Sequence, residues 1–400
     1  MRTKIEKLDH FGRGITYING KICFVDGALP LEDLKIKIVS ETKKYSFADV
    51  DDYYTLSDDR CDVLCPYDNV CGGCNLLHLN FSGENKFKCM KVKEILKKFG
   101  NINEELVTDT ISDSEYNYRN KITLHCDDNM LGYYRKGTKR IVPIEKCLLV
   151  DEEINKVIKV LNELIYDNDI DEVVIRVSND SSEIMVSITG DISNYEELQN
   201  VVDVLEINNE IVLGDESIIS NIGNKKYYVS SKSFFQVNKT LTEKLYNEVL
   251  DVIKKVQPKK VLDLYCGTGT IGIYISDCVD EVVGVDYSKS GILDAKKNSL
   301  LNNVNNCSFI CDKVENVIDS FNDIDMIIVD PPRAGLDDKT IENIKRINPQ
   351  DIVYISCDPV TLGRDLKLFS DMYEVVIVKP YNMFPKTYHV ENFVLLKRKK

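Results

Sequence analysis

The first part of the chain alternates apolar and polar residues in short runs that end at turn signals. GITYI is followed by Asn19-Gly20, and KICFV is followed by Asp26-Gly27, before the strand-like run LKIKIVSE. Asn-Gly or Asp-Gly between alternating apolar runs is typical of a β-hairpin. Regular short strands with such turns predict a small β-barrel at the N-terminus, which we place at residues 1–57.

The middle of the chain, residues 58–228, mixes helical and strand periodicities. A cysteine-rich, glycine-containing loop at about 58–90 leads into a helical run that ends in KVKEILKKFG. Beyond it, KITLHC, LGYYRK, EVVIRVS and EIMVSITG have the pattern of strands, and residues 151–167 have the spacing of an amphipathic helix. We therefore expect a central α+β domain that carries the cysteine-rich loop.

The last part, residues 229–400, has more continuous apolar runs. VLDLY, VVGVD, IDMIIVD and DIVYISC alternate with helical stretches, and EVVIVKP and NFVLLKRK close the chain. Strands that are apolar on both faces and alternate with helices indicate a parallel sheet covered by helices. The prediction is a Rossmann-like α/β domain that ends in an antiparallel hairpin, so the whole chain is expected to be a multidomain α/β protein.

Composition limits the function classes. The chain has 400 residues, 43% of them hydrophobic, and lacks both a membrane-spanning apolar run, which needs about 18 residues, and the apolar centre of a signal peptide. We expect a cytoplasmic protein without a membrane partner, in which thirteen cysteines indicate metal binding or catalysis rather than disulfides. The net charge of −14 argues against coating nucleic acid with the whole surface, although the first 48 residues carry nine basic and six acidic residues.

A glycine-rich turn follows the first apolar strand of the C-terminal domain. VLDLYCGTGTIG places three glycines between a strand and a helix, and a second strand ends at Asp286, whose carboxylate can bind ribose hydroxyls. Dinucleotide enzymes and S-adenosylmethionine (SAM) enzymes share this arrangement, so the turn by itself leaves both open. Three further carboxylates favour SAM, because they suit its positive charges better than they would suit a pyrophosphate. Asp263 precedes the glycines, Asp312 follows the strand-like run SFIC, and Asp330 opens Asp-Pro-Pro at the end of another apolar run.

Cys357 and Glu391 are the candidate reactive groups. Cys357 follows the strand DIVYIS, at an edge where α/β sheets present groups to ligands, and Glu391 stands just before the last strand. A cysteine is a strong nucleophile, and a carboxylate can remove a proton. The alternative is that Cys357 is a small buried side chain and Glu391 a solvated strand end. Arg333 follows an Asp-Pro-Pro sequence where enzymes that N-methylate bases usually have an aromatic residue, which disfavours N-methylation.

Three cysteines lie close together in the run CPYDNVCGGC. Cys65, Cys71 and Cys74 have a short, glycine-containing spacing, and Cys147 could supply a fourth thiolate, with Cys61 as a rival for the first position. Four thiolates can hold zinc or an iron-sulfur cluster, and the spacing alone does not choose between them.

Five C-terminal motifs occur together in one order. They are SFFQVN (233–238), LDLYCG (262–267), DPPRAG (330–335), SCDP (356–359) and HVE (389–391). In this combination the chain resembles the SAM-dependent RNA uracil-C5 methyltransferases, which include 23S rRNA enzymes and the tRNA T-loop enzyme. Residues 1–50 resemble the TRAM domain, an OB-like RNA-binding module, and YRNK (118–121) resembles a central-domain motif of the same family.

The resemblance implies a class I methyltransferase domain and a mechanism. Cys357 would attack C6 of the target uracil, C5 would take the methyl group of SAM, and Glu391 would remove the C5 proton. The resemblance also implies the SAM contacts, which are Gln236, Tyr265, Thr270, Asp286, Asp312 and Asp330. One position departs from the family pattern, since Asp358 stands after the nucleophile where Asn is usual. A carboxylate there would raise the pKa of the thiol if it faced it.

A cluster and a substrate are implied as well. Family members with C-x5-C-G-G-C and a later cysteine carry a 4Fe-4S cluster, here at Cys65, Cys71, Cys74 and Cys147. A barrel together with a cluster resembles the rRNA enzymes, so 23S rRNA is the expected partner of a monomeric enzyme. The T-loop uridine of tRNA is the alternative.

Two other functions are compatible with parts of the sequence. A non-catalytic RNA-binding protein would need no reactive cysteine, and a nicotinamide oxidoreductase is the local interpretation of GTGTIG. Candidate phosphate contacts are the basic N-terminal module, Arg119, Lys121 and the basic tail at 397–400.

Overall fold

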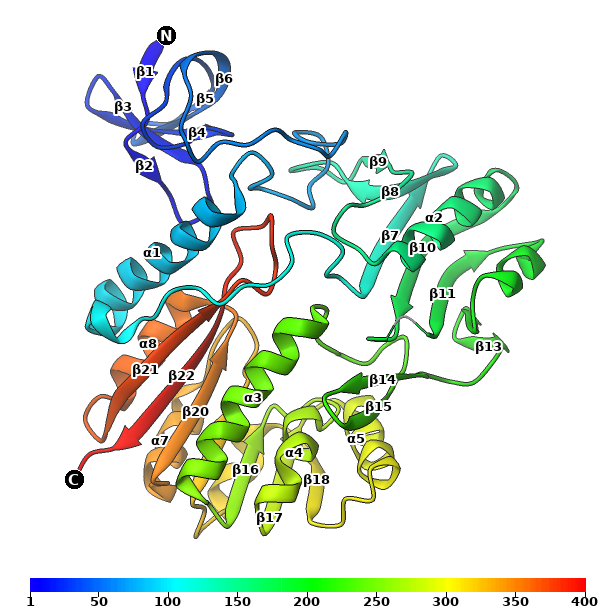
Figure 1. The fold of residues 1–400 in the computed structure, drawn as a ribbon, viewed down its shortest axis with the longest axis vertical. Coiled ribbons are helices and arrows are strands. Elements are labelled where there is room, and N and C mark those ends of the chain that lie inside the picture. Colours follow the sequence, from blue (N-terminus) through cyan, green and yellow to red (C-terminus); the bar gives the residue numbers. More distant parts are fainter. Residues whose placement is uncertain (181) are drawn as a thin grey trace.

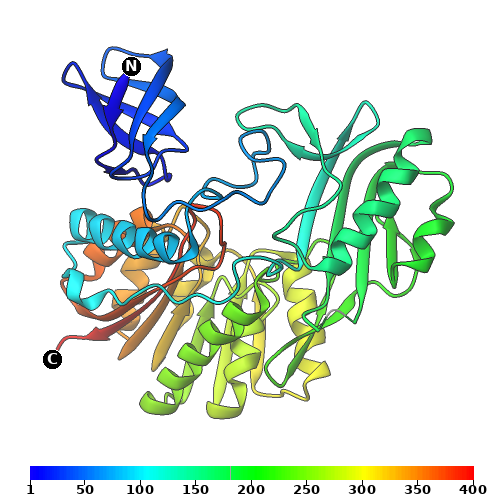
Figure 2. The same ribbon diagram turned by 45° about the horizontal axis from the view of Figure 1, so that its top comes forward.

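The computed structural model describes residues 1–180 and 182–400, which form two sheets of seven strands, one of six and one of two. Figures 1 and 2 show the N-terminal strands, the central sheet and the C-terminal sheet as three separate bodies, with helix α1 (Phe81–Gly100) beside the C-terminal one. The expected multidomain α/β architecture is confirmed. Within these two ranges, no helix combines the length and apolarity needed to cross a membrane.

The N-terminal sheet has the strand order β1-β5-β6-β4-β3-β2. Its strands are β1 (Arg2–Lys4), β2 (Lys7–Leu8), β3 (Gly14–Ile18), β4 (Lys21–Asp26), β5 (Asp33–Glu41) and β6 (Tyr45–Thr55). β1 and β2 are the two edges of the sheet, yet only Ile5 and Glu6 separate them in the chain, so the sheet curls until its edges approach each other. The predicted small barrel is confirmed, with Ile5, Val25 and Leu34 in its core.

The central sheet has the order β13-β12-β11-β10-β7-β8-β9 and is covered by helix α2 (Glu152–Leu164). Its strands are β7 (Lys121–Asp127), β8 (Met130–Tyr134), β9 (Ile141–Pro143), β10 (Asp169–Val177), β11 (Ile184–Asp191), β12 (Val204–Ile207) and β13 (Glu210–Leu213). The apolar face of α2, which includes Ile154, Val157 and Leu161, is buried in the same core as β10 residues such as Val173 and Ile175. This arrangement is the predicted α+β domain.

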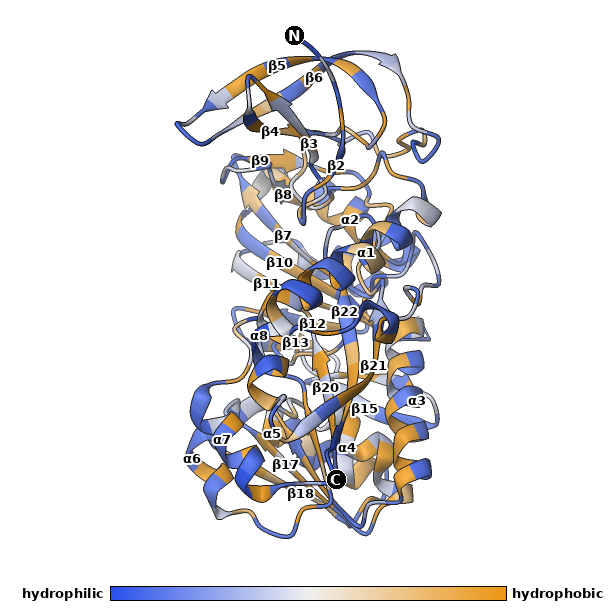
Figure 3. Ribbon diagram, turned by 90° about the vertical axis from the view of Figure 1, so that its left-hand side faces the viewer, coloured by the Kyte–Doolittle hydropathy of each residue, from blue (hydrophilic) through white to orange (hydrophobic). Residues whose placement is uncertain are grey.

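The C-terminal sheet has the order β18-β17-β16-β19-β20-β22-β21, in which the first five strands are parallel and β22 is antiparallel to its neighbours. Its strands are β16 (Lys260–Leu264), β17 (Glu281–Asp286), β18 (Cys307–Cys311), β19 (Met326–Val329), β20 (Asp351–Ser356), β21 (Tyr373–Tyr381) and β22 (Glu391–Arg398). Its helices are α3 (Lys239–Val256), α4 (Thr270–Ile275), α5 (Lys289–Leu301), α6 (Val314–Val317), α7 (Asp338–Ile347) and α8 (Pro359–Phe369). Every residue of β20 is buried, and Figure 3 colours much of this strand as hydrophobic. The predicted Rossmann-like domain is confirmed, and its strand order reverses between β16 and β19, where such sheets bind ligands.

Part of the segment expected to form the central domain packs against the C-terminal domain instead. α1 lies across α8, and their backbones approach closely enough that a Cβ on Gly100 would lie 3.1 Å from the Gly363 carbonyl oxygen. The hairpin of β14 (Ile218–Ile222) and β15 (Lys225–Val229) packs against α5. Periodicity predicted helix α1 but could not say which neighbour covers its apolar face. The short 3-10 helices of the described residues are Glu104–Leu106, Ile165–Asp167, Tyr195–Asn200, Ser276–Cys278 and Ile318–Ser320.

Candidate active site

The carboxyl ends of the parallel strands and the start of β22 share one edge of the C-terminal sheet, which we call the active-site edge. β16 through β20 run in one direction and β22 runs in the other, so the residues that end the first five strands meet the residue that opens the last. Six of the residues predicted from the sequence are placed at this edge: Tyr265, Asp286, Asp312, Asp330, Cys357 and Glu391.

The glycine turn between β16 and α4 is held by Asp286. Gly267 and Gly269 have φ values of 54° and 73°, a region that favours glycine, and a Cβ on Gly267 would meet no atom within 4 Å. The Oδ2 of Asp286 accepts a hydrogen bond from the Gly267 N–H at 3.0 Å, and its Oδ1 accepts one from the Ser288 N–H at 2.7 Å. The carboxylate therefore joins two loops of the edge and leaves the Gly267 side of the turn open.

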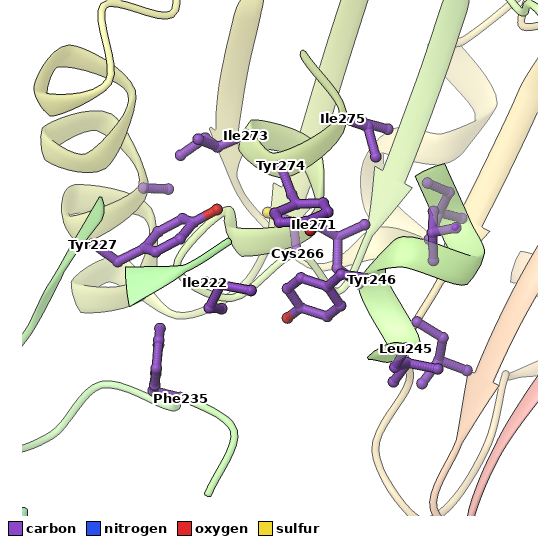
Figure 4. Packing of buried hydrophobic residues seen from close by; sticks show 14 of the residues in the cluster. Ile222, Tyr227, Phe235, Leu245, Tyr246, Cys266, Ile271, Ile273, Tyr274 and Ile275 are labelled. Atoms are coloured by element: carbon purple, nitrogen blue, oxygen red, sulfur yellow. The ribbon is translucent and has the colours of Figure 1, made fainter. Parts of the chain in front are cut away.

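Thr270, the first residue of α4, faces the packed side of the same turn. Its hydroxyl lies 2.7 Å from the Tyr246 hydroxyl, and its carbonyl oxygen accepts a hydrogen bond from the Tyr227 hydroxyl at 3.1 Å. Figure 4 shows both tyrosines among the buried side chains around Ile271 and Cys266. The Thr270 hydroxyl is thus engaged by the core in this structure.

Asp263 is a buried carboxyl group directly behind the glycine turn. It is 1% exposed, its Oδ2 accepts from the Gly272 N–H at 3.1 Å, and its Oδ1 has no hydrogen-bond partner among the described residues. Burial, reinforced by the charges of Asp330 and Asp286, raises the pKa of Asp263 to about 8. A buried carboxyl with a free oxygen fits a cationic ligand at this turn, because a nearby positive charge lowers the cost of ionising it.

Gln236 lies in the segment that enters α3, and the central domain holds this segment. The Asn120 side chain donates to the Gln236 carbonyl oxygen at 3.3 Å, and the Asn120 N–H donates to the Val237 carbonyl oxygen at 2.9 Å. From β10, the buried Arg176 donates to the Ser233 carbonyl oxygen at 2.8 Å. Sequence reasoning did not single out Arg176, since nothing in its neighbourhood along the chain marks a role at this edge.

Tyr265 and Asp312 make contacts at the other side of the edge. Tyr265 has a φ of 63°, and burial raises the pKa of its hydroxyl, which lies near Thr340, to about 12. Asp312 accepts hydrogen bonds from the Asn316 side chain at 2.8 Å and from the Lys313 N–H at 2.7 Å, and these bonds hold the pKa of Asp312 below its usual value. Asp312 is therefore ionised at neutral pH.

Cys357 and Glu391 lie next to each other across β20 and β22. The antiparallel register pairs Ser356 with Asn392, and the Asn392 side chain donates to the Ser356 carbonyl oxygen at 3.1 Å. One step beyond this pair, the register brings Cys357 opposite Glu391, whose charge contributes to the raised pKa of the thiol. The structure thus brings together the two residues that the sequence singled out as reactive.

Acidic groups surround the thiol, and one cation moderates their effect. Burial, followed by the charges of Glu391 and Asp330, raises the pKa of Cys357 to about 12, so the group is a thiol at neutral pH. Burial and Asp330 raise the pKa of Glu391 well above its ordinary value, and burial raises the pKa of Asp330 to about 7. Arg333 opposes these shifts for Cys357 and Glu391. Groups that titrate near neutral pH can accept and release protons during catalysis.

Asp358, which departs from the family pattern, caps helix α8. Its Oδ1 accepts hydrogen bonds from the N–H groups of Val360 at 2.8 Å and Thr361 at 3.1 Å. Asn caps helices as well as Asp does, because its side-chain oxygen accepts the same bonds. The charge of Asp358 is the smallest of the named contributions to the raised pKa of Cys357. Asp358 in place of Asn therefore preserves the helix cap and makes formation of the Cys357 thiolate slightly less favourable.

The loop at 382–390, which we call the base loop because it leads into Glu391, is anchored by buried charges on α1. The Glu84 carboxylate accepts from the Lys386 N–H at 3.0 and 3.1 Å and from the Asn382 side chain at 3.0 Å, and it pairs with Lys88 at 2.8 Å. All four side chains are fully buried. No motif in the sequence predicted this network, since Glu84 and Lys386 are 302 positions apart along the chain.

His389 belongs to the base loop and lies beside Arg333. Burial, together with the charges of Arg333 and two lysines, lowers the pKa of His389 to about 4, so its ring is neutral at neutral pH. The Arg333 guanidinium lies 3.5 Å from the His389 Nε2. A neutral ring can accept a hydrogen bond there and so help to orient Arg333 toward the reactive pair.

The cysteine-rich loop contacts the same base loop. Asn75 and Leu76 donate their N–H groups to the Lys386 carbonyl oxygen at 2.9 and 3.1 Å, and the Lys386 ammonium donates to the Leu79 carbonyl oxygen at 2.9 Å. A change in the path of the cysteine loop would therefore move the segment that positions Glu391.

The four predicted cluster ligands converge without closing into a metal site. Burial raises the pKa values of Cys71, Cys74 and Cys147, and the charges of neighbouring cysteines add to the effect, with Cys74 influenced by all three of the others. The Gly73 N–H donates to the Cys71 Sγ at 3.4 Å. In residues 1–180 and 182–400, no group of three or more Cys, His, Asp or Glu side chains is arranged to hold a metal ion. The predicted metal site is therefore not confirmed.

Comparisons with known proteins accord with the arrangement of the active-site edge. The tRNA (uracil-5-)-methyltransferase family matches residues 82–399, and the TRAM domain matches residues 1–50. Uncharacterized RNA methyltransferases of Halalkalibacterium halodurans and Aquifex aeolicus are 32% and 34% identical to this chain, over 99% and 100% of its length and 96% and 99% of theirs. The crystal structure of Pyrococcus abyssi tRNA (uracil-54, C5)-methyltransferase in complex with S-adenosyl-L-homocysteine is similar with a TM-score of 0.82 and 27% identity, over 99% of this chain and 100% of that one.

Proposed function

Since this chain belongs to the tRNA (uracil-5-)-methyltransferase family and is a SAM-dependent RNA methyltransferase with a TRAM domain, we propose that it forms 5-methyluridine through a covalent adduct between Cys357 and C6 of the target uracil. The observation that carries the proposal is the register that sets the half-buried Cys357 opposite the buried Glu391, with the charges of Asp330 and Arg333 acting on both groups. The family sets aside the hypotheses of a nicotinamide oxidoreductase and of a non-catalytic RNA-binding protein.

Covalent addition solves a problem of reactivity at C5. This carbon is too weak a nucleophile to attack a sulfonium directly, and addition of sulfur at C6 converts it into an enolate-like carbon. Cys357 forms the Sγ–C6 bond, and its thiol proton passes to a carboxylate of the cluster, for which Asp330, with a pKa of about 7, is our candidate. SAM, when bound, would supply an electrophilic methyl group on its sulfonium. As the C5–CH3 bond forms, the S–CH3 bond breaks, and its electron pair stays on sulfur, which leaves as the neutral thioether S-adenosylhomocysteine.

Glu391 completes the exchange. After methylation, C5 bears both the methyl group and its original proton. The Glu391 carboxylate removes the proton, the C–H electron pair restores the C5–C6 double bond, and the C6–Sγ bond breaks to release Cys357 as a thiolate. The raised pKa of Glu391 suits this step, because a carboxylate of high pKa is a stronger base once ionised.

The glycine turn is our candidate SAM site. The unpartnered Oδ1 of buried Asp263 and the open side of Gly267 fit a cationic ligand. Thr270 would contribute through the backbone of the turn, since its hydroxyl is bonded to Tyr246. We assign the remaining SAM contacts to Gln236, Tyr265, Asp286, Asp312 and Asp330.

The cysteine-rich loop would hold a 4Fe-4S cluster once its four sulfurs close around it. Support comes from the partly buried cysteines at positions 65, 71, 74 and 147 and from the Gly73 N–H group, which donates to the Cys71 Sγ. The pKa values of Cys71, Cys74 and Cys147 are each raised in part by the charge of a neighbouring cysteine. Cys61 instead donates its thiol to the Leu77 carbonyl oxygen at 3.4 Å. The cluster would serve folding and RNA placement, because no step of the mechanism moves an electron.

Metal analysis tests this assignment. Protein purified without oxygen is expected to contain iron and sulfide, to lose both in Cys74→Ala, and to keep both in the matched variant Cys61→Ala. Iron-free protein with bound zinc would overturn the cluster.

23S rRNA is our first candidate substrate, and the tRNA T-loop is the second. From the sequence, the predicted barrel and cysteine loop favoured an rRNA substrate. The structure of a tRNA enzyme of Pyrococcus abyssi nevertheless matches 99% of this chain, so the domain layout does not distinguish an rRNA substrate from a tRNA substrate. In either RNA the target base must leave its stack to reach the half-buried Cys357 thiol.

Methyl transfer from labelled SAM, followed by mapping of 5-methyluridine in rRNA and tRNA from cells with and without the protein, tests the proposal. Cys357→Ala is expected to lose methylation, by more than about 10⁴-fold, as when other covalent enzymes lose their nucleophile, and to form no adduct with RNA that contains 5-fluorouridine. Cys278→Ala, which removes an exposed thiol, should keep both methylation and adduct formation with 5-fluorouridine RNA. A fully active Cys357→Ala would remove the cysteine from the mechanism, and loss of 5-methyluridine from tRNA alone would select the second substrate.

A further inference from the structure

A groove of about 680 Å³ that is lined by several basic side chains lies on the central domain. It is formed by the β7–β8 hairpin, the residues that follow it, and the two glycines of the cysteine loop. Four cations line it, and among the described residues that line it there is no Asp or Glu; the cations are Arg119, Arg135, Lys136 and Lys139. In a protein of net charge −14, such a surface is suited to a polyanion.

Two of these cations are available to a ligand. Arg135 and Lys139 are exposed, and no described residue gives either side chain a hydrogen bond or ion pair. Lys136 pairs with Asp26 of the N-terminal barrel at 3.0 Å, and the Arg119 side chain donates to the Lys121 carbonyl oxygen at 2.7 Å. The groove is therefore tied to the barrel on one side and keeps free positive charge on the other.

Aromatic rings stand in the same groove. The rings of His125 and Tyr134 stack at 4.2 Å with an angle of 16°, and Tyr134 is 39% exposed. The Gly72 N–H donates to the Tyr134 carbonyl oxygen at 3.0 Å. A Cβ at position 72 would lie 2.9 Å from that oxygen, so the cysteine loop can pack against the hairpin only with glycine at this position. Exposed rings beside cations are the combination that binds single-stranded nucleic acid, because bases stack while phosphates pair.

The inner end of the groove reaches the segment that carries Gln236. Arg119 lines the groove, and its backbone forms an isolated β-bridge with Asn238. We infer that the groove binds a single-stranded part of the substrate RNA next to the target uridine, with Arg135 and Lys139 on phosphates and Tyr134 against a base. This inference rests on the RNA methylation proposed above and adds a second site of RNA contact on the central domain.

Binding of a fluorescent oligouridine across a range of salt concentrations tests the charges of the groove. Arg135→Ala/Lys139→Ala is expected to weaken binding about tenfold or more and to flatten the slope of log K against log salt by about 1.4, or ~0.7 for each lost contact to a single strand. The matched control Lys156→Ala/Lys159→Ala removes two exposed charges from α2 of the same domain and should leave the slope unchanged.

Tyr134 supplies an independent test. Tyr134→Ala should weaken oligouridine binding about tenfold without a change in salt slope, and Tyr134→Phe should restore it, because stacking needs the ring and not the hydroxyl. SAM affinity should be the same in all variants. Unchanged oligouridine affinity in both groove variants would overturn the inference, whereas a wild-type protein that binds oligouridine but transfers no methyl group would overturn the proposed function instead.

Discussion

Carboxyl groups at the two sides of the active-site edge come from equivalent strand ends but have opposite properties. Asp312, after β18, accepts two hydrogen bonds and has a lowered pKa. Asp330, after β19, and Glu391, the first residue of β22, receive no hydrogen bond from a described residue at their carboxylates, and burial raises their pKa values. Hydrogen-bond donors stabilise the ionised form, and burial without donors destabilises it. One side of the edge is therefore built to hold fixed charge and the other to exchange protons.

Replacing the proposed base is the most severe disturbance of the proton-exchanging side. Glu391→Gln keeps the shape of the side chain but cannot accept a proton, so methyl transfer should complete while release fails. We expect the turnover rate to fall by about 10²–10⁴-fold and a covalent protein–RNA species to accumulate on denaturing gels. Glu374→Gln, at an exposed position of β21, is the matched control. Turnover of Glu391→Gln at the wild-type rate would assign proton removal to another group.

Glu84 shows what a buried carboxylate does when donors surround it. Glu84→Gln should leave the Lys88 ammonium buried without its partner and lower the free energy of unfolding by about 3–5 kcal/mol. Because Glu84 also holds the base loop through Lys386, kcat should fall while SAM affinity stays the same. In the double variant Glu84→Gln/Lys88→Met, thermal unfolding should recover most of the lost stability; no recovery would mean that Lys88 is not the source of the cost.

The pH dependence of methylation should distinguish the two sides directly. Asp330 has a raised pKa of about 7, so its proton-accepting form grows as pH rises through neutrality. We expect kcat/KM to rise about tenfold between pH ~6 and ~8. Asp330→Asn should flatten this rise, whereas Asp312→Asn should keep it, because a group of lowered pKa is already ionised over the whole range. A profile that is flat in the wild-type protein would contradict the assignment.

The residue after the nucleophile should have the smallest effect. Asp358→Asn keeps the cap of α8 and removes one minor contribution to the raised pKa of Cys357. We expect kcat/KM to increase by about twofold or less, with no change in stability, since Asn and Asp are equivalent N-caps. Asp358→Ala, which removes the cap, should instead lower stability by about 1 kcal/mol.

Local sequence patterns were sufficient to predict the helices and strands and to single out the candidate site residues. Alternating runs around Asn19-Gly20 predicted hairpins, and continuous apolar runs predicted the parallel strands that carry Cys357 and Asp330, because burial on both faces leaves a direct mark in the sequence. The network of Glu84, Lys88 and Lys386 could not be predicted this way. Its members are ordinary charged residues, and only their distant partners make them buried and paired.

By itself, the sequence determined the three-part α/β architecture, the glycine turn and the candidate reactive side chains, because these depend on the order and spacing of residues along the chain. Only the tertiary structure decided which charges stay fixed and which titrate, that α1 supports the base loop, and that the cysteine loop lies on the β7–β8 hairpin. The physical reason is that pKa values, burial and ion pairing depend on the groups that surround a side chain in space, and these come from segments that the chain keeps far apart.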